Sequence, residues 1–483
     1  MSLDQSRTPL FEAVKYHVKR NAIPLQIPCH KHGHGLTEYE EFVGENVLRM
    51  DLNQTRGIDL VWNPTKVILE SEALLADAFG AERAYFLING TTSGVQAMIM
   101  SACKPGSQII IPRNAHKSIF NGLILSGAEP VYVQPEIDQN LGIVLGITET
   151  KLAAVIKQNP DASAVLTINP SYYGIAGHLK QIVDLAHRND MPVLVDEAHG
   201  SHMHFHPGFP VSAMQAGADL SAASLHKTGG SMTQSSVLLL NDTPYFDADY
   251  VRQVINLTYT SSPSYILLCS LDVARKQLAT SGEEILGRLL EMLRWTRSEI
   301  NSIDGLFAPD NSYFANNRPF YFDETKLLVN VHQLGLTGYE VEELLARDYN
   351  ILIELADKYN ILAITGLGDQ RSYLEAFVKA LKDIAAHAPG QAADKIQLIE
   401  FNPVITMPPR EAFYGDKKPV ALERCAGRVA GEMIMVYPPG IPLVSMGEII
   451  TGDIIDYIRK LKEARCTLVG TADPEVEYIM VID

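Results

Sequence analysis

Hydrophobic and polar positions along residues 66–240 follow two periods in turn. Short apolar runs typical of buried strands alternate with segments of about ten residues whose apolar positions recur at helical spacing. The predicted helices cover residues 92–103, 116–127, 149–160 and 179–190, and the predicted strands cover residues 107–112, 129–135, 163–169, 191–198, 221–227 and 235–240. This alternation predicts an α/β fold with a mostly parallel sheet that helices cover on both faces.

The second half of the chain predicts further domains. Helical spacing continues through residues 264–303, which fits a long helix or a helix pair between domains. A smaller α/β or α+β region follows, with strands predicted at residues 326–331, 351–356 and 360–365 and helices at 337–345 and 374–388. Residues 388–395 have the composition of a linker. We therefore expect an N-terminal arm at residues 1–65, a large domain at 66–303, a small domain at 304–392 and a C-terminal domain at 400–483.

Composition narrows the class of protein. A chain of 483 residues with 46% hydrophobic residues can form more than one core, and its net charge of −17 disfavours nucleic-acid binding while remaining compatible with a small cationic substrate. The five cysteines are scattered without a CxxC pair, which fits a reducing cytosol. The N-terminus lacks the apolar core of a signal peptide, and no apolar run reaches the length of a membrane span. We expect a cytoplasmic protein that is neither exported nor membrane-spanning.

Four polar stretches lie where helices begin or strands end. Residues 89–94, NGTTSG, begin a predicted helix, where free backbone N–H groups favour an anion such as phosphate, although the same residues could be an ordinary N-cap. Ligands of parallel sheets bind beyond the carboxyl ends of the strands. The other three stretches lie at such ends: His116; Asp196, Glu197 and His199; and Ser224, His226 and Lys227.

One ligand would account for all four stretches. Pyridoxal 5′-phosphate requires a phosphate cup, an acid facing its pyridine nitrogen, a flat side chain against its ring and a lysine whose amine bonds to its aldehyde. Asp196 and Lys227 are about thirty residues apart, which matches the ends of consecutive strands in one sheet. We expect Lys227 to be internal because it bonds to the cofactor, and neutral enough to attack because burial and the adjacent cofactor disfavour its charged form.

The chain resembles the fold-type-I pyridoxal-phosphate enzymes, whose large domain is of the aspartate-aminotransferase type. Among them it is most similar to the ornithine/lysine/arginine decarboxylase family, in particular to the short bacterial branch that contains the biosynthetic arginine decarboxylases. The resemblance covers nearly the whole chain and is carried by NGTTSG, IPRNAHKSI, NPSYYG, VLVDEAHGSHMHFH, SLHKTGGSMTQSS, SSPSYILLCSLDVAR and YPPGIPLVSMGEIIT.

The resemblance implies a role for each residue of the cofactor site. The phosphate would be held by Thr91, Thr92 and Ser93, with help from Ser224 and His226. The ring would lie between His116 and Ala198, with Asp196 at its nitrogen and His199 near its hydroxyl group or the substrate carboxylate. The catalytic residues would be Lys227, His116, Asp196 and His226. Ser261 would reach the phosphate of a neighbouring subunit, because the family builds its sites at a dimer interface, which implies a homodimer or a larger even homo-oligomer.

The implied reaction is decarboxylation of a basic amino acid, with arginine ahead of lysine and ornithine. For arginine, the product would be agmatine, a polyamine precursor. Reprotonation of the substrate carbon would fall to Lys227 or His226. Two alternatives remain open. The same cofactor could serve oxidation, deamination or aminotransfer, or the chain could be a non-catalytic regulator of the same fold. The presence of Lys227 and Asp196 argues against a regulator.

Some features leave the substrate open. The family usually has Pro-Gly-His-Lys where this chain has Cys29 in the glycine position, and Asp-Asp-Leu-His-x-Pro-x-Gly where it has residues 59–66 with Trp62. Glu432, beside the YPPGIP motif, is a guess for the residue that recognises the charged end of the substrate side chain.

Three histidines, His202, His204 and His206, alternate as on one face of a strand, a pattern that can bind zinc or copper. Because the same histidine-rich segment accompanies the aspartate motif in the resembled family, we expect no metal.

Overall fold

The computed structural model describes residues 3–315, 320–390, 402–437, 441–463 and 466–483. By compactness the chain divides into two units. Unit 1 comprises residues 1–101 and 194–287, and unit 2 comprises residues 102–193 and 288–483. Among the described residues, no helix combines the length and the apolar content needed to cross a membrane. The domain boundaries expected from the sequence stay a prediction.

Unit 1 carries the N-terminal segments and four strands of the large sheet. Its helices are α1 (Pro9–Lys19), α2 (Thr37–Val43), α3 (Glu45–Met50), α4 (Val67–Phe79), α5 (Gly90–Ala102), the 3-10 turn η1 (Met203–Phe205), α9 (Ala213–Ala216), the π-helical turn η2 (Leu225–Gly229), α10 (Ala248–Thr258) and the first part of α11 (Tyr265–Asn301). Its strands are β1 (Arg83–Leu87), β8 (Val193–Asp196), β9 (Leu220–Ala223) and β10 (Ser236–Leu240), in the order β1-β10-β9-β8.

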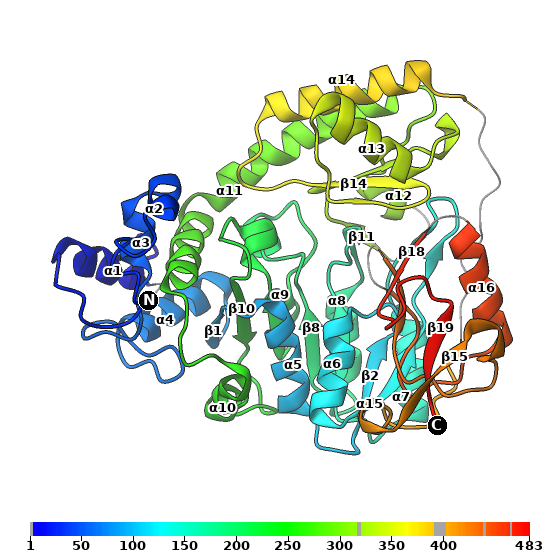
Figure 1. The fold of residues 1–483 in the computed structure, drawn as a ribbon, viewed down its shortest axis with the longest axis horizontal. Helices are drawn as coiled ribbons and strands as arrows, with labels where there is room; N and C mark the ends of the chain where they lie inside the picture. The colour runs from blue at the N-terminus through cyan, green and yellow to red at the C-terminus, as the bar shows by residue number, and fades with distance from the viewer. Residues whose placement is uncertain (1–2, 316–319, 391–401, 438–440, 464–465) are drawn as a thin grey trace. The chain divides into compact units, whose positions relative to one another are not determined.

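The pairing in unit 1 is mixed. Strands β8 and β9 are parallel, whereas β9 pairs with β10, and β10 with β1, in antiparallel register. Every residue of β8, β9 and β10 is buried, which explains their unbroken apolar or small-residue sequences. Helix α11 spans 37 residues as a single element (Figure 1), so the long helix expected at residues 264–303 is confirmed.

Unit 2 holds the other three strands of the large sheet, in the order β6-β2-β3, and β2 runs parallel to both β6 and β3. The elements of this part are β2 (Gln108–Pro112), α6 (Lys117–Ser126), β3 (Glu129–Val133), β4 (Ile137–Asp138), β5 (Ile143–Val144), α7 (Glu149–Gln158), β6 (Val165–Ile168), β7 (Ile175–Ala176) and α8 (Leu179–His187). The α/β class with a mostly parallel large sheet is therefore confirmed.

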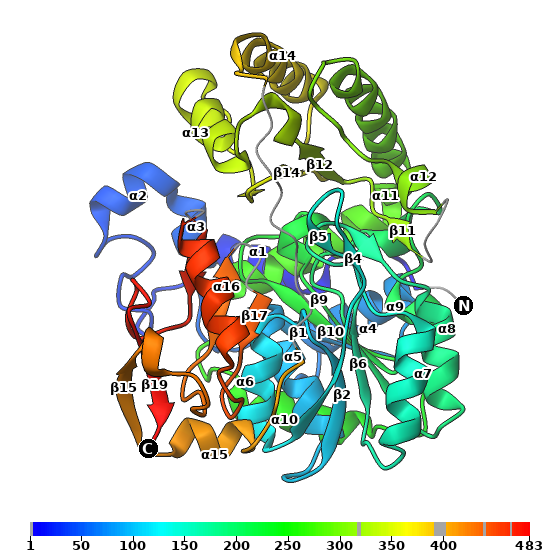
Figure 2. The ribbon, with the colours of Figure 1, turned by 90° about the vertical axis from the view of Figure 1, so that its right-hand side faces the viewer.

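A three-stranded sheet in the order β12-β14-β13 forms the core of the next part of unit 2, with α13 and α14 packed together along it (Figure 2). Its elements are α12 (Asn311–Ala315), β11 (Tyr321–Phe322), β12 (Lys326–Asn330), η3 (His332–Leu334), α13 (Gly338–Tyr349), β13 (Leu355–Ala356), β14 (Asn360–Ile364) and α14 (Arg371–His387). The strand expected at 351–356 is too long, since only its last two residues pair. The expected linker lies partly outside the described residues.

The last part of unit 2 has its own apolar core around Ile434, Val444 and Ile458. Its elements are α15 (Pro409–Tyr414), β15 (Lys417–Ala421), η4 (Leu422–Arg424), β16 (Ile434–Tyr437), β17 (Ile441–Val444), α16 (Gly452–Glu463), β18 (Thr467–Val469) and β19 (Tyr478–Ile482). Strands β15 and β19 pair with each other, and β16 lies between β17 and β18. These antiparallel pairs account for the short, mixed pattern of the C-terminal sequence.

Candidate active site

The carboxyl ends of β8 and β9 lie side by side in unit 1. The two strands run parallel, with Asp196 at the end of β8 in register with Ala222 of β9. Ser224 follows directly after β9 and is buried, as Asp196 is. The expectation that the aspartate and lysine segments leave neighbouring strands at one edge is confirmed, and it places both segments where parallel sheets bind ligands.

The two adjacent acids Asp196 and Glu197 have different surroundings. The Glu197 carboxylate accepts hydrogen bonds from the backbone N–H of Ala213 (2.7 Å) and from the Ser221 hydroxyl (3.0 Å), so it ties the start of α9 to β9. Asp196 accepts a longer bond from the Ala198 backbone N–H at 3.2 Å. Side chains alternate along an extended strand. Glu197 is therefore a structural acid, and Asp196 is the acid at the end of the strand.

Lys227 lies on the π-helical turn η2 and not on a strand. Strand β9 ends at Ala223, so the strand expected over 221–227 is too long. Leu225 and Thr228 point into the protein and are buried, whereas the Lys227 side chain is exposed in the single chain. The expectation of an internal lysine is therefore wrong for the single chain. Short π-helical turns are rare and are frequent at functional sites.

The amine of Lys227 contacts an imidazole. Its Nζ lies 2.8 Å from Nε2 of His199, a buried residue three positions after Asp196. One of the two nitrogens must donate a proton and the other must accept it, so lysine and histidine cannot both carry their full complement of protons in this contact. The contact joins the aspartate motif to the lysine motif.

A buried hydroxyl supports the lysine turn. Ser201 donates to the backbone carbonyl of Ser224 at 3.0 Å, and its Oγ lies 2.8 Å from Oγ1 of Thr228. Both residues are almost fully buried. Ser201 thus holds the turn on either side of Lys227. Sequence reasoning missed this residue, because its only signal is its place directly after the DEAHG motif.

The start of helix α5 is bound to the end of β9. Thr91 Oγ1 lies 2.5 Å from Ser224 Oγ and donates to Ser236 Oγ at 3.0 Å, while Ser93 Oγ donates to the Gly90 carbonyl. Thr92, between them, is exposed. The first turn of a helix has backbone N–H groups without intrahelical partners, and its dipole favours an anion. Thr91, Thr92, Ser93 and Ser224 are therefore brought together in an arrangement suited to phosphate.

Gly94 explains how closely α5 approaches the sheet. A Cβ atom at this position would lie 2.8 Å from Leu87 Cδ1 of β1 and 3.0 Å from Ala222 Cβ of β9. Distances this short would force the helix away from the strands. The glycine keeps the helix start seated at the ends of β1 and β9.

His226 is half-buried and held by a backbone carbonyl. Its Nδ1 lies 2.8 Å from the carbonyl oxygen of Ser235, which can only accept, so Nδ1 carries the proton and Nε2 has the lone pair in the neutral ring. Burial lowers the pKa of His226, the Ser235 carbonyl opposes this, and the positive charge of Lys227 lowers the pKa further. The neutral imidazole is the form that the fold favours.

We predict a pH effect on stability from His226. Because its pKa is below the ordinary value of 6.5 in the folded chain, the unfolded chain binds this proton more readily as the pH falls through that range, and the free energy of unfolding drops. The variant H226Q lacks this contribution. Between pH 7 and pH 5, the melting temperature should therefore fall more for the parent protein than for H226Q. An equal fall in both proteins would contradict a lowered pKa of His226 in the folded chain.

His116 is the N-cap of helix α6 in unit 2. Its Nδ1 accepts from the Ser118 backbone N–H at 3.2 Å and lies 2.9 Å from the Ser118 hydroxyl, while the ring is exposed. Ser261, in unit 1, is also exposed, and its carbonyl accepts from the Gln54 side chain at 2.8 Å. The roles expected for His116 and Ser261 at the cofactor stay predictions.

The histidine-rich segment after the aspartate motif is not a strand. Residues 203–205 form the 3-10 turn η1, and the three rings have different neighbours. His202 and His206 lie edge-on to Phe209, at centroid distances of 4.7 and 5.6 Å, whereas His204 packs on Phe79. The alternation that suggested a common strand face is therefore wrong.

Glu432 is a structural acid of the C-terminal part of unit 2. Its two carboxylate oxygens accept from the backbone N–H groups of Ala472 (2.7 Å) and Met480 (2.8 Å), and the side chain is buried. Backbone bonds to both oxygens explain why this acid tolerates burial. We therefore discard Glu432 as the residue that recognises the substrate.

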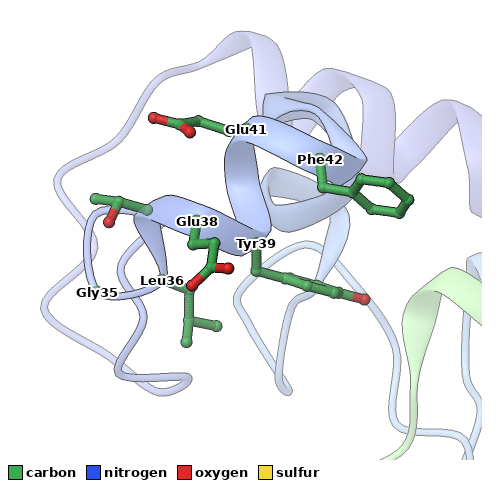
Figure 3. A pocket seen from close by; sticks show the side chains of 7 residues that line it. Gly35, Leu36, Glu38, Tyr39, Glu41 and Phe42 are labelled. Carbon is green, nitrogen blue, oxygen red and sulfur yellow. The ribbon is translucent and has the colours of Figure 1, made fainter.

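The described residues of unit 1 also form an open hollow of about 870 Å³ on the N-terminal arm (Figure 3). It is lined by the start of α2, including Leu36, Glu38, Tyr39 and Phe42, and follows the glycine- and histidine-rich segment 30–35. None of the residues expected at the cofactor lines it. Leu36, Tyr39 and Phe42 leave 45%, 54% and 90% of their surface exposed, which is unusual for side chains of this kind.

The donor set of unit 1 fits pyridoxal 5′-phosphate. It offers an exposed amine (Lys227), a buried carboxylate at a strand end (Asp196), a hydroxyl-lined helix start (Thr91 and Ser93) and an imidazole in contact with the amine (His199). These are the chemical groups that the aldehyde, the pyridine nitrogen and the phosphate of this cofactor require.

Comparison with known families decides where the chain belongs. A family model of the major domain of ornithine/lysine/arginine decarboxylases matches residues 8–373, and the model of their C-terminal domain matches residues 391–474. The chain belongs to the ornithine/lysine/arginine decarboxylase family. It is therefore an enzyme of a decarboxylase family, as the sequence motifs indicated.

Relatives of this decarboxylase are similar over most or nearly all of their lengths. The arginine decarboxylase of Bacillus anthracis is 44% identical over 484 residues, covering 99% of this chain and 98% of that protein. The arginine decarboxylase of Bacillus subtilis (strain 168) is 43% identical, covering 99% of each. The structure of the constitutive lysine decarboxylase of E. coli has a TM-score of 0.84 at 21% identity, covering 100% of this chain and 82% of that one. This structural likeness confirms the predicted fold class.

Proposed function

We propose that this decarboxylase converts L-arginine to agmatine and carbon dioxide with pyridoxal 5′-phosphate. The observation that carries the proposal is the Lys227 amine, which contacts His199 at 2.8 Å on a turn that follows the strand next to Asp196. The two arginine decarboxylases that are 43–44% identical over 99% of the chain support arginine as the substrate. The expected activity implies a place in polyamine synthesis and a cytoplasmic enzyme.

The cofactor would be held by the groups of unit 1 and by His116. Thr91, Thr92 and Ser93 at the start of α5 would bind the phosphate, with Ser224 beside them. Asp196 would keep a proton on the pyridine nitrogen, because a buried carboxylate favours a neighbouring positive charge. Ala198 and the ring of His116 would cover the two faces of the cofactor. When bound, the cofactor supplies the electron sink that accepts the pair left by the departing carboxylate.

The site also provides a path for protons. The Lys227 amine must be neutral to bond to a carbonyl carbon, and His199 Nε2, at 2.8 Å, can accept the proton that this requires. After the carboxylate leaves, a proton must return to the substrate carbon. Lys227 can deliver it from the exposed end of its side chain, whereas His226 holds its only proton at Nδ1 against the Ser235 carbonyl. This favours Lys227 over His226 as the final acid.

His226 and Ser261 are proposed to act at the phosphate. His226 presents Nε2 on the side opposite its bond to Ser235, and Ser261 is exposed on the segment between α10 and α11. An exposed hydroxyl of this kind suits a phosphate of a neighbouring subunit. The Gln54 side chain, which binds the Ser261 carbonyl, belongs to the N-terminal arm and would keep Ser261 in that position.

The exposed apolar arm supports an even homo-oligomer. Ile23, Leu25 and Phe42 leave 84%, 91% and 90% of their surface exposed, and Leu36 and Tyr39 line the hollow beside Phe42 (Figure 3). Apolar side chains gathered in one exposed segment indicate a protein interface. A second copy of the chain with its active site at this interface is the partner we propose. We expect no nucleic-acid partner and no membrane contact.

The proposed function is tested by the products. Purified enzyme loaded with pyridoxal 5′-phosphate is given arginine, lysine, ornithine and uncharged amino acids in competition, and carbon dioxide, amines, ammonia and peroxide are measured. We expect agmatine and carbon dioxide in equal amounts from arginine, with no ammonia and no peroxide. Cadaverine or putrescine as the main product would move the assignment to lysine or ornithine. Ammonia or peroxide would favour oxidation or deamination.

A further inference from the structure

Glu448, the single acid of the motif YPPGIPLVSMGEIIT, contacts a residue that lies close to His116 in the chain. Glu448 forms two hydrogen bonds with the guanidinium of Arg113: Nη1 to Oε1 at 2.6 Å and Nη2 to Oε2 at 2.8 Å. Arg113 is the residue after strand β2 and belongs to the motif IPRNAHKSI. Two motifs more than three hundred residues apart in the chain are thus joined within unit 2.

The pair is enclosed by further bonds. Arg113 Nη2 also donates to the Leu443 carbonyl at 3.0 Å, and Glu448 Oε2 accepts from the Ser445 backbone N–H at 2.9 Å. The guanidinium lies 4.6 Å from the centroid of the Tyr132 ring. Arg113 and Glu448 are 6% and 1% exposed, so neither charge can be satisfied by water if the other is removed. We call this set of contacts the Arg113 clamp.

The clamp lies at the beginning of the segment that presents His116. Arg113 still belongs to the sheet ladder, since its backbone N–H donates to the Val133 carbonyl at 2.9 Å. The chain then turns, with Ala115 N–H donating to the Pro112 carbonyl at 3.2 Å, and His116 caps α6 through Ser118. Only Asn114 and Ala115 separate Arg113 from His116. A shift of Arg113 must therefore be absorbed within two residues or passed on to the His116 ring.

We propose that the Arg113–Glu448 clamp is a positioning device through which the C-terminal part of the chain sets the orientation of His116 over the cofactor ring. The inference rests on the proposed function, because it uses His116 as the residue that covers the ring. It assigns Glu448, the single acid of the YPPGIPLVSMGEIIT motif, a role in the active site without any contact to substrate or cofactor. Glu448 and Arg113 are thus positioning residues.

A second contact between the same parts of unit 2 provides a matched control. Arg410 of α15 donates from Nε to the Ile124 carbonyl at 2.7 Å and from Nη2 to the Leu125 carbonyl, near the end of α6 opposite its N-cap His116. Helix α6 has ten residues, so the two ends are about 15 Å apart. Loss of Arg410 weakens the docking of the C-terminal part but leaves the His116 end of the helix untouched.

The experiment compares E448Q, R113K and R410A as holoenzymes with pyridoxal 5′-phosphate, using arginine as the substrate. Four quantities are measured: kcat, KM, circular dichroism in the visible cofactor band, and melting temperature. In E448Q and R113K we expect kcat to fall about 10- to 100-fold, the size expected for a misplaced contact, with little change in KM. The visible circular dichroism should change as well, because this signal depends on the asymmetric protein surroundings of the cofactor ring. R410A should lower only the melting temperature.

The substitution E448Q is also made in the H116A background. If the clamp acts through His116, E448Q should lower kcat in the parent and have no further effect in H116A. Should E448Q fail to fold, R113K, which keeps the positive charge, carries the same expectations. The proposal is overturned if E448Q retains the parent kcat and visible spectrum, if R410A reproduces its effects, or if E448Q lowers kcat equally in H116A. A parent enzyme that releases no carbon dioxide from arginine refutes the proposed function instead, and the cofactor spectra still test the clamp.

Discussion

The variant K227A is expected to lose decarboxylation by about 10³-fold or more, because it removes both the amine that we propose bonds to the cofactor and the acid that we propose returns the proton. Alanine also removes the contact between Nζ and His199 Nε2 at 2.8 Å and leaves no polar group in its place. Carbon dioxide release from arginine, measured at saturating cofactor, gives the rate. The fold should survive, since the Lys227 side chain is exposed.

The control is K227R, which keeps a positive charge beside His199 but cannot form the same bond with an aldehyde carbon. It should be as inactive as K227A. Activity in K227R near that of the parent would show that only the charge of residue 227 matters. Activity in K227A would show that the amine used by the enzyme is another one, and would contradict the account.

The second large effect is expected for D196N. We expect kcat to fall about 10²- to 10³-fold, because the amide would lack the negative charge with which we propose Asp196 keeps a proton on the pyridine nitrogen of the cofactor. Asn is close to Asp in shape, and the hydrogen bond from the Ala198 backbone N–H can be kept. The measurement is kcat for carbon dioxide release, together with the visible absorption of the bound cofactor.

The adjacent residue provides the control. E197Q alters a carboxylate on the same strand end that binds the Ala213 N–H and the Ser221 hydroxyl, contacts that tie α9 to β9. It should lower the free energy of unfolding by about 1–3 kcal/mol, the cost of disturbing a buried acceptor, and leave the cofactor spectrum unchanged. If D196N kept full activity while E197Q lost it, the assignment of the two acids would be reversed.

Much of the fold is readable from local pattern. The long helix α11 keeps a regular apolar spacing over its whole length, and strands β2, β6 and β8 are short apolar runs between helices, so each could be recognised within its own segment. The neighbouring ends of β8 and β9 also followed from the sequence, because a strand, helix and strand in one parallel sheet return the chain to the same edge.

Other features depend on contacts that no local pattern contains. The residues SAASLHK have strand-like spacing throughout, but the chain leaves the sheet after Ala223 and forms a π-helical turn supported by Ser201, which lies twenty-three residues before Ser224. Glu432 beside the YPPGIP motif looked available for a substrate, whereas its oxygens are used by the backbone of Ala472 and Met480. The Arg113–Glu448 pair joins residues far apart in the chain, and two ordinary charged residues give no sign of it in the sequence.

The central claim is that the amine of Lys227 bonds to the cofactor. Purified enzyme saturated with pyridoxal 5′-phosphate is reduced with borohydride, digested with a protease and analysed by mass spectrometry for the peptide that carries the cofactor. We expect a single labelled site at Lys227, with loss of the visible absorption band. A label on another lysine, or a protein that takes up the cofactor without any covalent label, would contradict it.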